Sequence, residues 1–91
     1  MDIKEKGKAF VIENETGDII AQITYQYETD NIIVANSTFV DPSLRGQGIA
    51  KRLLDKLADF ARENDLKIRP LCSYVVKAFE KSKEYGDVAL K

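Results

Sequence analysis

The sequence predicts an α+β fold, in which a mostly antiparallel sheet of four strands contains one parallel pair and packs against helices. Three observations support this prediction. Short runs rich in β-branched residues, separated by turn residues, occupy residues 8–40. Apolar residues then recur at helical spacing over residues 50–64. A short apolar run and a second amphipathic segment follow, which gives a strand, helix, strand, helix order.

The first three strands are predicted from alternation and from turns. Residues 8–14 form the first strand, and Thr16-Gly17-Asp18 supplies a turn because glycine tolerates a positive φ. Residues 19–27 alternate between apolar and polar side chains, which predicts a half-buried strand paired with the first as a hairpin. The apolar face of this second strand comprises Ile19, Ala21, Ile23, Tyr25 and Tyr27. After a turn at residues 29–31, residues 32–40 form a third antiparallel strand.

Pro42 ends the third strand, because proline cannot donate to a sheet and disfavours helix for the preceding Asp41. A long helix is then predicted to run from Ala50 to about Asn64. Its apolar stripe comprises Ala50, Leu53, Leu54, Leu57, Ala58 and Ala61.

Two more elements complete the chain. Residues 66–71 form a short strand, which a right-handed crossover places parallel to the third strand. Residues 73–81 form a second, shorter helix, whereas the segment after Tyr85 receives no assignment. All elements are expected to belong to one domain over residues 1–91.

The composition excludes several classes of function. A formal net charge of −1 without a basic tract argues against nucleic acid and against an anionic membrane as partner. The single cysteine cannot form an internal disulfide, and we find no signal peptide or membrane-length apolar run. A cytoplasmic location is therefore expected. Because histidine is absent, we expect no metal site and no histidine general base.

The segment Arg45-Gly46-Gln47-Gly48-Ile49-Ala50 lies between the third strand and the long helix. Glycines allow a tight bend there, and the first N–H groups of a helix have no partner inside it. These groups and the helix dipole together favour a phosphate ligand. Neither the P-loop nor the dinucleotide-binding fingerprint fits this spacing. The alternative is a plain turn that leads into a helix.

This segment and its neighbours resemble the signature of the GNAT superfamily of acyl-CoA-dependent N-acetyltransferases. Arg45, Gly48 and Ala50 stand in register with that signature, after a strand and before an apolar helix. Residues 71–74 and 79–85 are similar to the short YjdJ-type subgroup of the superfamily. The resemblance covers roughly residues 32–85, and it implies a minimal GNAT-like fold with acetyl-CoA as the cofactor.

The resemblance also implies where the coenzyme binds. Backbone groups of Phe39 and Val40 would hold the pantetheine arm. The pyrophosphate would be held by the N–H groups of Arg45, Gly46, Gln47, Gly48, Ile49 and Ala50. Lys51 and Arg52 would add positive charge, although solvated helix-surface residues are an equally good interpretation of both.

The side chains for catalysis are harder to identify. Larger family members carry a tyrosine as general acid where this chain has Phe79. Tyr74 and Tyr85 are candidate substitutes, but each is more simply a packing residue with its hydroxyl at the surface. The third strand has no carboxylate. Cys72 remains as the candidate catalytic residue, because a helix amino terminus lowers a thiol pKa and the thiolate could accept the acetyl group. The alternative for Cys72 is a small buried apolar residue.

The leading hypothesis is an acetyl-CoA-binding protein that moves the acetyl group to an unidentified amine, on a small molecule or a protein, through Cys72. The first alternative is a sensor or carrier that binds acetyl-CoA without turnover. The second is an interaction module in which residues 45–50 are only structural. The short chain favours an open acceptor groove. A monomer or a weak homodimer is expected.

Overall fold

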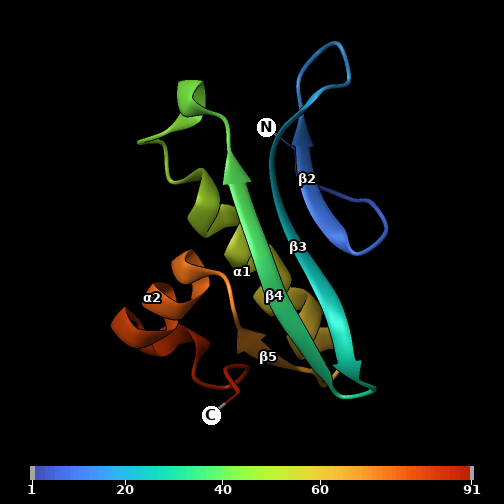
Figure 1. Cartoon of the computed structure of the whole chain (residues 1–91), viewed down its shortest axis with the longest axis vertical. Helices are drawn as coiled ribbons and strands as arrows, with labels where there is room; N and C mark the ends of the chain where they lie inside the picture. The colour runs from blue at the N-terminus through green and yellow to red at the C-terminus, as the bar shows by residue number, and fades with distance from the viewer. Residues whose placement is uncertain (1, 91) are drawn as a thin grey trace.

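A computed structural model describes residues 2–90 and contains one sheet with the strand order β1-β2-β3-β4-β5. In chain order the strands are β1 (Lys4–Glu5), β2 (Ala9–Glu13), β3 (Ile19–Thr29), β4 (Ile32–Val40) and β5 (Lys67–Pro70). The strands from β1 to β4 pair antiparallel with their neighbours, and β4 pairs parallel with β5 (Figure 1). The predicted α+β class and the single parallel pair are confirmed.

The predicted number of four strands is wrong, because β1 adds a fifth at the edge of the sheet. This strand has only two residues, and Lys4 pairs with Val11 of β2. Lys4 and Lys6 also form ion pairs with Glu13 at the far end of β2. Two residues are too few to show a period, so the sequence pattern gives no signal for this strand.

Both predicted helices are present. They are α1 (Ile49–Glu63) and α2 (Ser73–Lys81), so α1 begins one residue earlier than predicted. Helix α1 lies across one face of the sheet (Figure 1), and the side chains of its apolar stripe belong to the core there. The fully buried members of that stripe are Leu53, Leu54, Leu57, Ala58 and Ala61. Burial of each leucine stabilises the fold by roughly 1.5–3 kcal/mol.

The apolar face of β3 is shorter than predicted. Ala21, Ile23 and Tyr25 are buried, whereas Ile19 and Tyr27 are 43% and 46% exposed. Both exposed residues lie next to irregularities, because the register shifts against β2 near Ile19 and against β4 between Tyr27 and Thr29. A strict two-residue alternation cannot anticipate such shifts.

Strands β4 and β5 separate halfway along β4. Their pairing ends where Ala35 lies opposite Pro70, and the N–H groups of Leu71 and Cys72 both donate to the Ala35 carbonyl. At the same point the pairing of β4 with β3 skips Asn36, because Thr24 lies opposite Ser37 and Tyr25 lies opposite Ala35. This irregularity is a β-bulge. The second half of β4 therefore borders a gap in the sheet, where the chain passes into α2.

The segment after α2 covers the outer edge of β5. It begins with the short 3₁₀ helix η2 (Lys83–Tyr85). The Ile68 N–H then donates to Val88 over 2.7 Å, and the Leu90 N–H donates to Ile68 over 2.8 Å. Arg62 of α1 holds this segment through an ion pair with Asp87. The part of this segment after Tyr85 is the one that received no assignment from the sequence pattern.

Candidate functional site

A pocket of about 320 Å³ lies at the amino terminus of α1. Three parts of the fold form its walls: the carboxyl end of β4, the loop with the 3₁₀ helix η1 (Pro42–Leu44), and the first turns of α1 and α2. The lining residues are Val40, Leu44, Arg45, Gly46, Gly48, Ile49, Ala50, Lys51 and Tyr74. The pocket thus joins segments that are 34 residues apart in the sequence, from Val40 to Tyr74.

The loop before α1 has a fixed local structure. The Asp41 carboxylate accepts hydrogen bonds from the Ser43 N–H over 2.9 Å and from the Ser43 hydroxyl over 2.7 Å. These bonds lower the pKa of Asp41, the N–H of Ser43 contributing most. Gly46 and Gly48 then adopt positive φ angles of 84° and 70°. Residues with side chains rarely adopt this conformation, which explains both glycines.

This bend leaves a row of free backbone donors at the pocket. The first hydrogen bond into α1 runs from the Arg52 N–H to the Gly48 carbonyl, and no side chain caps the helix. Within residues 2–90, the N–H groups of residues 46–51 have no hydrogen-bond acceptor. The Arg45 N–H was predicted to hold the pyrophosphate with the others, but it donates to the Pro42 carbonyl over 3.3 Å. Such a row of amides is suited to an anion.

The space beside Gly46 and Gly48 is open. A Cβ atom added at Gly46 or at Gly48 would meet no other atom within 4 Å. No neighbouring side chain or backbone therefore crowds the bend on the side where a residue other than glycine would carry its side chain. The local structure fits the phosphate part of a coenzyme.

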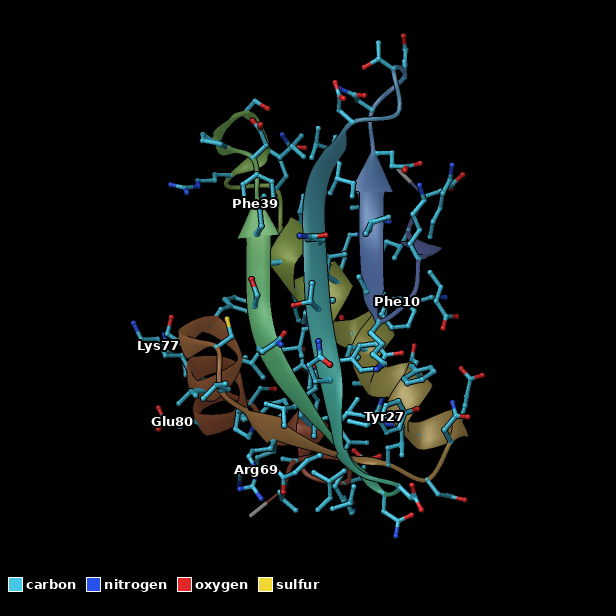
Figure 2. All side chains as sticks on the ribbon, turned by 45° about the vertical axis from the view of Figure 1, so that its right-hand side comes forward. Phe10, Tyr27, Phe39, Arg69, Lys77 and Glu80 are labelled. Carbon is cyan, nitrogen blue, oxygen red and sulfur yellow. The ribbon has the colours of Figure 1, made fainter. Side chains whose placement is uncertain are left out.

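Seven of the nine predicted coenzyme-binding residues line the pocket, whereas Phe39 and Gln47 do not. Phe39 is 43% exposed, and it lies opposite Gln22 of β3 in the pairing of the two strands. Figure 2 shows Phe39 near the carboxyl end of β4, far from Arg69 at the other end of the sheet. Lys51 borders the pocket, but its ammonium group already contacts Asp55 at 3.0 Å and Glu84 at 2.9 Å.

Backbone groups of β4 also face the gap in the sheet. The Asp41 N–H donates to the Ile20 carbonyl of β3 over 2.8 Å. Because neighbouring residues of a strand direct their N–H groups to opposite sides, the Val40 and Thr38 N–H groups point away from β3. They point toward the side that β5 has left, so this half of β4 offers donors to an extended ligand.

Cys72 lies at this gap, at the residue preceding α2. Its Sγ is half-buried and lies 3.4 Å from the Thr38 hydroxyl oxygen. Burial acts to raise the pKa of the thiol, but the Thr38 hydroxyl and the N–H groups of Val75, Tyr74 and Thr38 favour the thiolate. Their combined effect lowers the Cys72 pKa below its ordinary value. The structure thus brings Cys72 close to β4. The spacing of residues in the sequence did not indicate the contact between Cys72 and Thr38.

The aromatic residues near the site have different environments. Tyr85 is buried and donates its hydroxyl to Asp55 over 2.6 Å, so the prediction of a surface hydroxyl is wrong for this residue. The Phe79 ring packs on the Tyr85 ring with centroids 5.4 Å apart. Tyr74 lines the pocket, and desolvation raises the pKa of its hydroxyl.

Residues 2–90 contain neither of two further features. No group of three or more histidine, cysteine or acidic residues is placed to hold a metal ion. No helix in this part of the chain has the length and apolar character needed to cross a bilayer.

Comparison with known proteins identifies the family. A family model for GCN5-related N-acetyl-transferases matches residues 9–88, which includes the whole pocket. The chain belongs to this family. The strand, glycine bend and helix of the pocket are therefore parts of a GNAT domain, as the resemblance implied. The YjdJ-type subgroup stays a prediction.

Three relatives show how far this GNAT similarity extends. A solution structure of a GCN5-like N-acetyltransferase candidate from Staphylococcus aureus has a TM-score of 0.84 and 38% identity, and the match covers 98% of this chain and 87% of that one. Human protein NATD1 is 39% identical over 57 residues, which are 63% of this chain and 50% of that protein. The chain spans about half the length of the curated relatives it matches.

The third relative shows the fold alone. The GNAT family protein YhbS from Escherichia coli, solved in complex with CoA, has a TM-score of 0.64 at 20% identity. The match covers 80% of this chain and 44% of that one.

Proposed function

We propose that this GNAT chain binds acetyl-CoA and transfers the acetyl group to an amine. One observation carries the proposal: the N–H groups of residues 46–51 have no acceptor, and all of these residues except Gln47 line an open pocket at the amino terminus of α1. This arrangement supports binding of the coenzyme diphosphate. The CoA complex of E. coli YhbS, which shares the fold, agrees with this choice of ligand.

The pantetheine arm would then lie along β4, in the gap that β5 leaves. The N–H groups of Val40 and Thr38 supply donors along this path. Of the two predicted pantetheine-binding residues, Val40 lines the pocket, whereas the same alternation directs the Phe39 N–H toward β3. The arm would lead the thioester toward Thr38 and Cys72. A backbone N–H of β4 would stabilise negative charge on the thioester oxygen as it develops.

Cys72 is the proposed acetyl acceptor. Its thiolate would attack the thioester carbonyl, so that a new carbon–sulfur bond forms at Cys72 and the bond to the coenzyme sulfur breaks. The coenzyme thiolate would take a proton from solvent. An amine would then attack acetyl-Cys72, lose a proton to water and carry the acetyl group away. The lowered pKa of Cys72 supports the first step, because the thiolate is the reactive form.

Mass spectrometry with acetyl-CoA tests this route. An adduct of one acetyl group should form on the wild-type chain and disappear in both Cys72→Ala and Cys72→Ser. Coenzyme release with a panel of primary amines measures the complete reaction. An adduct that persists in Cys72→Ala contradicts the role of Cys72 in acetyl transfer.

A carrier or sensor without turnover is the second candidate. It is favoured by the lack of a general acid at these two aromatic residues. Phe79 has no hydroxyl, and the Tyr85 hydroxyl donates to Asp55. No histidine is present as a base for the amine. Coenzyme binding with neither an acetyl adduct nor coenzyme release, over the whole amine panel, would support this second candidate and contradict the first.

A further inference from the structure

Three charged side chains form an ion-pair cluster at the edge of the coenzyme pocket. They are Lys51, Asp55 and Glu84. The Lys51 Nζ contacts Asp55 Oδ2 at 3.0 Å and Glu84 Oε1 at 2.9 Å. One cation and two carboxylates leave the cluster with a net negative charge. This charge opposes the binding of phosphate, which Lys51 would favour under one of its two interpretations.

The two carboxylates determine the direction of the Lys51 side chain. Lys51 is the third residue of α1, and the side chains of a helix lean toward its amino terminus. The free amides of the pocket lie at that end. Asp55 stands one turn in the opposite direction, and Glu84 comes from η2, far along the chain. Together they hold the ammonium group between α1 and η2.

Both carboxylates keep another partner if Lys51 leaves. Asp55 still accepts the Tyr85 hydroxyl over 2.6 Å, and Glu84 still accepts the Ser82 hydroxyl over 2.9 Å. The side chains of Asp55 and Glu84 are 43% and 48% exposed, so water can replace the ammonium group. Exposed ion pairs of this kind are individually weak. The Lys51 contacts can therefore be exchanged for another anion at small cost.

We propose that Glu84 competes inside the chain for Lys51, and that the ammonium group exchanges Glu84 for a phosphate oxygen when coenzyme A binds. This inference rests on the proposed function and adds a residue that sets the affinity. It also links the segment after α2 to the coenzyme pocket. By reciprocity, coenzyme binding would loosen the contact between η2 and α1 to the same extent.

Calorimetric titration with coenzyme A at low salt tests the exchange. Glu84→Gln removes one carboxylate and should tighten binding about two- to fivefold, the range of a weak exposed ion pair. Glu63→Gln is the matched control, because it makes the same charge change at the exposed carboxyl end of α1. Its affinity should equal that of the wild type. Pantetheine, which has no phosphate, should bind Glu84→Gln and the wild type equally.

A double-mutant cycle separates exchange from simple repulsion. In a Lys51→Ala background the gain from Glu84→Gln should disappear, since no ammonium group is left to release. An equal gain in that background overturns the exchange, and so do equal affinities of Glu84→Gln and Glu63→Gln for coenzyme A. If the wild type does not bind coenzyme A, the proposed function fails together with this inference. Binding without an effect of Glu84 removes the inference alone.

Discussion

Gly48 combines a backbone role and a ligand role at one residue. Its φ of 70° belongs to the left-handed region, and a Cβ atom there would point into open space. The same geometry occurs at Gly17, where φ is 87° and no atom lies within 4 Å of an added Cβ. Gly17 lies in the turn between β2 and β3, so it is a matched control without a pocket.

Gly48→Ala and Gly17→Ala should both lower the free energy of unfolding by about 1–2 kcal/mol, because each forces a side chain into the left-handed region. Only Gly48→Ala should weaken coenzyme binding, by about tenfold or 1.4 kcal/mol, since its methyl group occupies the space of the diphosphate. Urea denaturation and calorimetry measure the two effects. Equal coenzyme affinity of the two variants would contradict the phosphate site.

Thr38 is the residue whose hydroxyl acts on the Cys72 thiol. Burial opposes the thiolate, while the Thr38 hydroxyl is the strongest of the groups that favour it. Thr38→Val should therefore raise the Cys72 pKa, and iodoacetamide should alkylate the thiol more slowly at pH 7. The pH profile of alkylation gives the pKa directly. Ser37→Ala, at the exposed neighbouring position, should leave the profile unchanged.

At the scale of the elements, α1 connects the core to the pocket. Its apolar stripe is fully buried from Leu53 to Ala61, and its amino terminus carries the free amides. Because the helix is fixed along its length by this packing, the amides of residues 46–51 have a defined position before a ligand arrives. Stability and binding are thus supported by different parts of one helix.

Leu57→Ala removes a fully buried side chain in the middle of α1. The loss of burial and the cavity left behind should lower the free energy of unfolding by about 2–5 kcal/mol. Lys56→Ala, at the exposed neighbouring position, should change it by less than about 0.5 kcal/mol. Urea denaturation of both variants measures the difference. A small effect of Leu57→Ala would contradict the packing described for α1.

Periodicity and turn residues predicted the long elements well. The range of α2 agrees with its prediction, and α1 differs by one residue at its start. The sequence could not predict β1, because two residues have no period, or the bulge at Asn36, because it depends on register across two strands. The edge pairing of residues 88–90 also depends on contacts with β5 that no local pattern encodes.

At the scale of the whole molecule, the candidate site lies where β4 parts from β5. The glycine bend was predictable, since two glycines and a following amphipathic helix are local signals. The positions of Tyr74 at the pocket and of Thr38 beside Cys72 were not predictable, because only the fold brings the start of α2 to the pocket and to β4. The pairing of Lys51 with Glu84, 33 residues away, likewise required the structure.

The most direct test of the account is a titration of the ¹⁵N-labelled chain with coenzyme A, followed by NMR. We expect saturable shifts that are largest at the amides of residues 46–51 and at Val40, with small changes at the turn around Gly17. This result would place the diphosphate on the free amides and the pantetheine arm along β4. A spectrum that does not change at millimolar coenzyme A would contradict the central claim and leave only the fold and its family.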